Sequence, residues 1–331
     1  MDSQPASYSL MRWDGLARWI LLSTALVLAY GYITRIDKPN TYVRMALHEA
    51  IVSQDCLAPY RYRVLVPVTA ETLIRPLSAV VSRKEAFSGV YAIYEALAIT
   101  LMLLSLYAWL RRFYEPALAL VGCLFVSATV PMAFKDHYFH PWSLLEPGLL
   151  TLGLIAIAKE RIGVLLAVTV LASLNRETGI FIPLLWGAMK CWDGGLWDRE
   201  KMGIFLMLLF ASMLTLVGVL WIQGYAPPLH TPASLLLMNI SWRNLGRTLI
   251  NGVLFLGVFW VFVVKGYARS PKDVRRSAWV VPLYLLLIGI WGLWHEVRLL
   301  MPLYPILIPL ALAFLRDREG GDKVEGVASG K

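Results

Sequence analysis

Runs of about twenty apolar residues recur along this chain, and they limit its fold more than any other feature of the sequence. Examples are the segments 19–33, 204–222 and 279–294. A helix of about 20 residues crosses a hydrocarbon core of about 30 Å, and in lipid each segment must satisfy its own backbone hydrogen bonds. The runs lack the polar–apolar alternation of barrel strands. We therefore expect an all-α, polytopic transmembrane bundle.

About ten membrane segments are expected in a single integral membrane domain that covers residues 1–331. They are 16–33, 86–110, 116–134, 142–158, the two halves of 162–186, 203–223, 248–264, 278–294 and 299–315. Residues 34–84 form a long first outer loop, and residues 316–331 form a flexible cytoplasmic tail. The polar residues 175–179 interrupt the segment 162–186, which we interpret as two short spans that meet at a turn.

The basic residues set the orientation of these segments. The formal net charge is +9, and many lysines and arginines lie in short loops, where they mark the cytoplasmic side. The five basic residues from Lys265 to Arg276 lie on the cytoplasmic side only if the segment 162–186 crosses the membrane twice. Both termini are then cytoplasmic, and a bacterial inner membrane is the expected location. Because the charge is explained by loop positions, we expect no nucleic-acid partner.

The first outer loop is predicted to contain two amphipathic helices, 42–52 and 64–81, that lie in the membrane interface and contact lipids. Between them, Arg61 and Arg63 alternate with Tyr60 and Tyr62. Arginine binds phosphate through two hydrogen bonds at once, and tyrosine can stack on a sugar. This stretch therefore binds either a substrate phosphate or lipid headgroups.

Polar residues gather on the outer side at two further places. Asn175, Arg176 and Glu177 precede a short helix whose N-terminus attracts anions; the alternative is a polar helix cap with an Arg176–Glu177 pair. His295, Glu296 and Arg298 lie between the last two spans, where Arg298 is expected to hold a phosphate, with Glu296 positioning it and His295 nearby. The alternative is an interfacial Glu296–Arg298 pair with no substrate.

A third polar group lies in the second outer loop, where Asp136, His137 and His140 follow one another closely. Acid–base chemistry or hydrogen bonding to a substrate is the expected role. The spacing also fits one helical face of a metal site, but a third fixed ligand is missing. No metal ligand is therefore assigned, and a divalent metal is left as a weakly supported alternative.

The segment from His295 to Pro305 (HEVRLLMPLYP) resembles the late motif of lipid-linked mannosyltransferases of the GT-C superfamily. The resemblance implies a long first outer loop, a sugar donor on a polyprenyl-phosphate carrier, and an acid in that loop as the catalytic base. Asp37 matches this base by position. The paired acids common in such loops are absent, because Lys38 and Pro39 follow, so Glu49, Asp55 and Asp136 stay alternatives.

The leading hypothesis is a GT-C-like membrane glycosyltransferase (a hexosyltransferase) that acts on the outer face. Its partners would be a polyprenyl-phosphate-linked sugar and a glycan, lipid or protein acceptor. Displacement at the anomeric carbon needs a carboxylate base and cations for the leaving phosphate. The alternatives are a transporter or flippase for lipid-linked glycans and a non-catalytic membrane assembly protein. A flippase predicts charged residues toward both faces, whereas these cluster on one.

Overall fold

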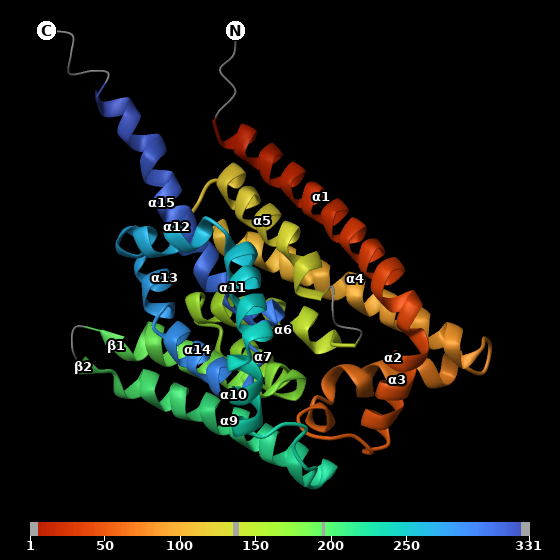
Figure 1. Ribbon diagram of the computed structural model, residues 1–331. Coiled ribbons are helices and arrows are strands. Elements are labelled where there is room, and N and C mark those ends of the chain that lie inside the picture. Colours follow the sequence, from red (N-terminus) through yellow and green to blue (C-terminus); the bar gives the residue numbers. More distant parts are fainter. Residues whose placement is uncertain (1–5, 135–138, 194–195, 326–331) are drawn as a thin grey trace, which may run out of the picture.

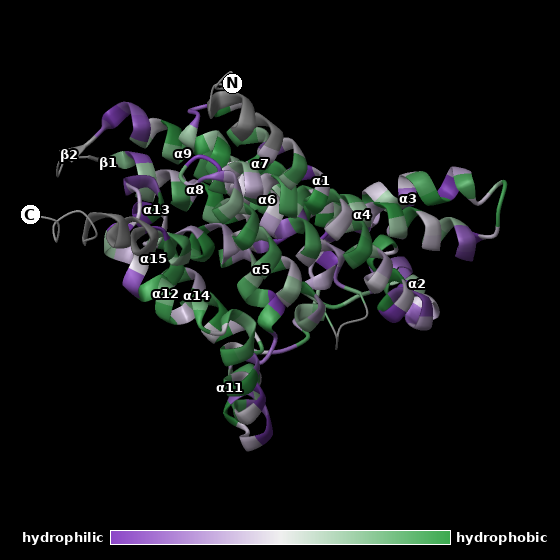
Figure 2. Cartoon of the chain, turned by 90° about the horizontal axis from the view of Figure 1, so that it is seen from above, coloured by the Kyte–Doolittle hydropathy of each residue, from purple (hydrophilic) through white to green (hydrophobic). Residues whose placement is uncertain are grey.

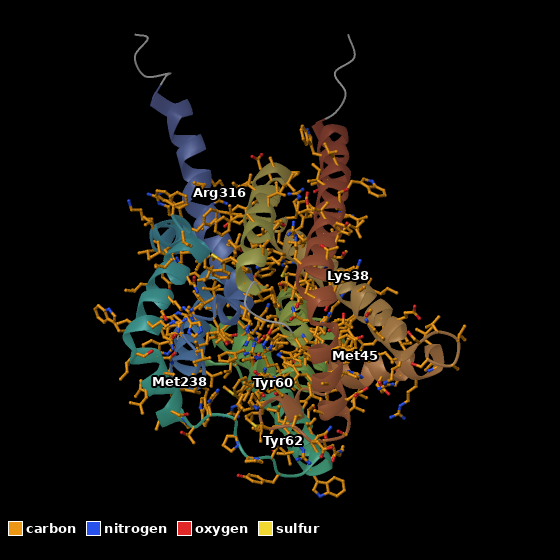
Figure 3. All side chains as sticks on the ribbon, turned by 45° about the vertical axis from the view of Figure 1, so that its right-hand side comes forward. Lys38, Met45, Tyr60, Tyr62, Met238 and Arg316 are labelled. Atoms are coloured by element: carbon orange, nitrogen blue, oxygen red, sulfur yellow. The ribbon has the colours of Figure 1, made fainter. Side chains whose placement is uncertain are left out.

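The computed structural model describes residues 6–134, 139–193 and 196–325, and nearly all of them are helical. Strands β1 (Trp192–Asp193) and β2 (Leu196–Trp197) form one short hairpin. The start of α1 (Ala6–Tyr32) and the end of α15 (Tyr304–Glu325) lie at the same end of the bundle (Figures 1 and 3). The predicted all-α class is confirmed.

The described residues include seven helical stretches that are long and apolar enough to cross a membrane, or eight if one bent pair is a single span. The chain is therefore an integral membrane protein, but these full-length stretches are fewer than the ten expected segments. They are Trp13–Val52, which includes most of α1 and α2 (Thr41–Val52); α4 (Arg83–Leu110); α5 (Pro116–Phe134); α6 (Pro141–Ala158); α9 (Arg199–Gln223); Lys272–Trp291, with α13 (Lys272–Ser277) and α14 (Val280–Trp291); and Val297–Arg316, with η7 (Val297–Leu303).

The interrupted segment folds back on itself after a short apolar helix. Its elements are α7 (Ile162–Asn175), η4 (Glu177–Ile180), α8 (Phe181–Trp186) and η5 (Gly187–Cys191). Arg176 adopts an extended backbone, which ends α7. A Cβ at Gly179 would lie 2.4 Å from the backbone nitrogen of Ser173, so only glycine lets η4 pack this closely against α7. The chain therefore turns at the predicted polar interruption.

The expected span 248–264 is bent. Helix α11 (Trp242–Leu256) and helix α12 (Phe259–Gly266) meet at an angle of 66°. The break follows Gly257, whose φ of +51° is costly for any residue with a side chain. The short elements around this pair are α10 (Pro232–Ile240) before it and η6 (Tyr267–Arg269) after it.

The segment 34–84, expected to be the first outer loop, contains the two predicted helices, α2 and α3 (Leu65–Leu77), joined through η3 (Tyr60–Tyr62). The turns η1 (Ile33–Asp37) and η2 (Lys38–Asn40) connect α1 to α2. In α3, Val66, Ala70 and Ile74 are buried at four-residue spacing, while Leu73 and Leu77 are exposed. Seen from above, α2 and α3 extend to one side of the bundle (Figure 2).

Local sequence signals set several helix starts. Ser82 begins α4 with a capping box, because its hydroxyl accepts from the Glu85 amide while the Glu85 carboxylate accepts from the Ser82 amide. Asp198 caps α9 through the amides of its first turn. Proline occupies the first position of α5 and α6, where no intrahelical donor is needed.

The segment η7–α15 forms the centre of the bundle, and 94% of its candidate span is buried. Pro309 has no amide hydrogen, so the Pro305 carbonyl one turn earlier loses its helical partner. The Trp109 indole of α4 donates to that carbonyl at 2.8 Å, which satisfies it inside the apolar core. On another side, Gly266 brings α12 against the backbone of α15.

Candidate functional site

Polar side chains in the interruption after α7 contact the first part of α6 through hydrogen bonds and an ion pair. The Asn175 amide donates to the Trp142 carbonyl at 3.0 Å. Arg176 pairs with Glu146 of α6 at 2.7 Å, and the Thr178 hydroxyl donates to the same carboxylate. Asn175 thus has a structural contact, and the Arg176 partner is Glu146 rather than the neighbouring Glu177.

The segment before η7 is held equally firmly. The amides of Asn239 in α10 and Asn251 in α11 donate to the carbonyls of Gly292 and His295 at 2.8 and 2.9 Å. Side chains from α10 and α11 therefore fix the backbone of residues 292–295, where the HEVR sequence begins.

Arg298 is buried, with 4% of its surface exposed. It pairs with Glu296 at 2.7 Å, and its second terminal nitrogen donates to the Ser143 hydroxyl at 3.3 Å. The expected Glu296–Arg298 pair is therefore present, and it faces α6 inside the bundle rather than lying free at a helix end.

Arg63 reaches the same region from the first outer loop. Its guanidinium lies 3.4 Å from Glu177 and stands over the rings of Trp142 and Tyr60, at 5.2 and 5.5 Å from their centroids. Figure 3 places Tyr60 in the half of the molecule away from Arg316 of α15. A buried arginine that is stacked and paired in this way is held in one orientation.

Arg63, Arg176 and Arg298 line one cavity of about 470 Å³, which we call the arginine cavity. Its other polar lining includes Glu177, Glu296, Thr178 and His230. The Nε–H of each arginine is buried and donates to no described residue. Because the three arginine side chains line one cavity and each carries a positive charge, the cavity is suited to an anionic ligand.

A second cavity of about 760 Å³ lies next to it, and we call it the histidine cavity. Its polar lining is His140, His295, Arg247, Asn251, Glu296 and Tyr60. Tyr60 and Glu296 line both cavities. Both volumes fall within the roughly 300–1,000 Å³ typical of small-molecule sites.

The structure places Asp37 outside both linings. Its side chain is buried and pairs with Arg44 of α2 at 2.6 Å, and Arg44 also pairs with Glu95 of α4 at 2.5 Å. The Arg44 guanidinium lies over the rings of Phe87, Tyr91 and Phe139. We call Asp37, Arg44 and Glu95 the ion triplet.

The other predicted site residues are distributed as follows. His140 and His295 line the histidine cavity, whereas Arg61 lines neither cavity and donates to the Tyr225 carbonyl at 3.3 Å. Asp136 and His137 lie outside the described residues. Among the residues described, no group of three His, Cys, Asp or Glu side chains is arranged to hold a metal ion.

Sequence reasoning missed the ion triplet and the contribution of α11. Glu95 stands inside an otherwise apolar span, and such a residue normally has a buried partner, so this signal was available. Arg247 and Asn251 are one helical turn apart on α11, a spacing that puts both on one face. Nothing local indicated that this face would meet His295.

In comparisons with known proteins, no protein-family model, no curated protein and no solved structure matches the chain.

Proposed function

We propose that the protein is a membrane glycosyltransferase that transfers a sugar from a polyprenyl-phosphate carrier to an acceptor. The observation that carries this proposal is the convergence of Arg63, Arg176 and Arg298 on one cavity. Charge-assisted hydrogen bonds from arginine are the strongest means by which a protein side chain holds a phosphate.

An apolar wall beside the three arginines supports a lipid carrier rather than a free phosphate compound. Leu287, Ile288 and Trp291 of α14 line the arginine cavity. The same helix exposes Leu286 and Ile290, at 59% and 43%, on the outside of the bundle, where a spanning helix meets lipid. A prenyl chain could therefore lie in the lipid along α14 while its phosphate group lies beside the arginines.

The chemistry follows from these positions. An acceptor hydroxyl attacks the anomeric carbon, the bond from that carbon to the phosphate oxygen breaks, and the phosphate leaves with the electron pair. The arginines neutralise the charge that develops on the leaving oxygen. The histidine cavity, which adjoins the arginine cavity at Tyr60 and Glu296, is the space in which the acceptor would lie.

The same proposal includes an orientation. The start of α1 and the end of α15 share one end of the bundle, which requires an even number of crossings. With the basic loops inside, both termini are cytoplasmic, and the two cavities open toward the outer face of a bacterial inner membrane.

The decisive experiment measures donor binding and sugar transfer by the full chain in detergent or nanodiscs, with a panel of polyprenyl-phosphate sugars. Replacement of Arg176 or Arg298 by alanine is expected to weaken donor binding by roughly tenfold or more, since a hydrogen bond to a charged group contributes about 1.5–3 kcal/mol. Lysine should restore only part of the affinity, because it lacks the planar fork.

Arg75→Ala is the matched control, since Arg75 also pairs with a glutamate but is 72% exposed on α3. It should bind donor as the wild type does. Unchanged donor binding in the Arg176 and Arg298 variants would contradict the phosphate site. Donor binding without transfer would favour the transporter alternative.

A further inference from the structure

Glu296 lies where the two cavities meet. Among the described residues, it is the carboxylate that lines both the arginine cavity and the histidine cavity. Its side chain is 13% exposed, so it is enclosed but not sealed from either space. A general base for glycosyl transfer must reach the acceptor hydroxyl while that hydroxyl faces the anomeric carbon, which is a position between the two substrates.

The backbone holds this carboxylate in place. Asn251 fixes the preceding carbonyl of His295, and the Trp294 amide donates to the Asn239 side chain at 2.9 Å. The Glu296 amide donates to the Leu293 carbonyl at 2.9 Å. A base held by contacts of this kind keeps its orientation during the reaction.

Other acids near the cavities are less suited. Glu146 is enclosed by Arg176 and Thr178 and lines neither cavity. Glu177 lines only the arginine cavity, where the leaving group would be. Asp37, the base that the family resemblance implies, pairs with Arg44 and lines neither cavity.

Arg298 now holds Glu296 at 2.7 Å, and it also lines the cavity proposed for the phosphate. An arginine engaged with a carboxylate occupies the oxygen that would otherwise accept a hydrogen bond from the acceptor hydroxyl. A phosphate in the arginine cavity competes for the same guanidinium. Once Arg298 turns to the phosphate, the Glu296 carboxylate is free to accept a hydrogen bond from the acceptor hydroxyl.

We propose that Glu296 is the proton acceptor of the transfer reaction and that Arg298 exchanges Glu296 for the donor phosphate when the donor binds. This rests on the proposed glycosyltransferase function. The acceptor O–H bond breaks and its proton goes to Glu296, while the acceptor oxygen bonds to the anomeric carbon. The carbon–phosphate-oxygen bond breaks, its electron pair leaves with the phosphate, and Glu296 later returns the proton to water.

The test compares wild type and Glu296→Gln for donor affinity and for single-turnover transfer. Glu296→Gln keeps the size of the side chain but cannot accept the proton, so transfer should fall by about 100-fold or more. Donor affinity should be retained or increased, because a carboxylate no longer competes for Arg298. Glu160→Gln is the matched control: Glu160 also forms an ion pair, with Lys190 at 2.6 Å, and lines neither cavity. It should change neither quantity.

A pH profile separates a base from a merely structural partner. The charged and titratable groups that line the two cavities with Glu296 come from several elements. They are His295, Arg298, Arg247, His140, Cys56, Tyr60, Arg63, Arg176, Glu177, His230 and Tyr284. These groups are unchanged in the variant, so the loss of the acidic limb of the transfer rate in Glu296→Gln would report the carboxylate itself.

If Glu296→Gln does not fold, Glu296→Asp serves as the second variant, because it keeps the charge and shortens the side chain. Transfer should then fall by about tenfold or more with donor affinity retained, since a misplaced base loses part of its effect. Transfer at the wild-type rate in a folded Glu296 variant overturns this inference alone. A wild type that transfers no sugar overturns the proposed function and this inference together.

Discussion

Arg44 offers a direct test of the packing that surrounds the first outer loop. Its side chain is 2% exposed and contacts two carboxylates at once, Asp37 at 2.6 Å and Glu95 at 2.5 Å. Arg44→Met keeps an apolar stem of similar length but removes the charge. Asp37 and Glu95 would then remain buried near each other without a cation, which is the costly arrangement for a low-dielectric interior.

Removing one partner of a buried ion pair costs about 3–5 kcal/mol. An unfolding entropy of about 2.1 cal/mol/K per residue over 331 residues amounts to about 0.7 kcal/mol/K. The melting temperature of Arg44→Met should therefore fall by roughly 4–7 °C. Adding Glu95→Gln should recover part of the loss, because one of the two unpaired charges is then gone.

Thermal unfolding in detergent, followed by the fluorescence of a thiol-reactive dye, measures these shifts. Arg75→Met is the control, because this exposed arginine also pairs with a carboxylate and exposed pairs contribute little. Equal melting temperatures for wild type and Arg44→Met would refute the buried ion triplet, and so would a double variant no more stable than Arg44→Met.

Three further predictions address topology, packing and pH. In a cysteine-free background, an impermeant thiol reagent added outside the cell should label His230→Cys but not Lys272→Cys; the opposite pattern would reverse the orientation. Gly266→Ala should cost about 1–3 kcal/mol in thermal unfolding, because its Cβ would lie 1.9 Å from a backbone oxygen of α15. Gly218→Ala in the interior of α9, with open space around it, should instead stabilise by about 0.5–1 kcal/mol. Burial raises the pKa of Glu71, but hydrogen bonds from one imidazole and two arginines outweigh burial and hold it below its ordinary value of 4.5. Its contribution to stability is therefore complete above that pH and is lost as the pH falls through the lowered pKa; Glu71→Gln should be less stable at neutral pH and lack this acid-dependent loss.

Several local features were predictable from the sequence because they depend on neighbouring residues alone. Apolar runs indicated an integral membrane protein of helices, since length and lack of charge decide whether a segment can cross lipid, although seven or eight candidate spans stand among the described residues where about ten were expected. Four-residue periodicity identified α3 as an amphipathic helix, and the polar run 175–179 marked the turn after α7. The bend at Gly257 was not predicted, because one glycine in an apolar run is compatible with a straight helix or with a turn.

Which charged residues would meet was decided only by the tertiary structure. The sequence singled out Arg63, Arg176 and Arg298, but their convergence on one cavity joins residues 63 and 298, which lie at opposite ends of the chain. It also presented Asp37 as the candidate catalytic base, whereas the fold buries it against Arg44. The physical reason is that hydrophobicity and helix length act within one segment. The partner of a buried charge, in contrast, depends on how several helices pack, and a single sequence does not contain that information in any local pattern.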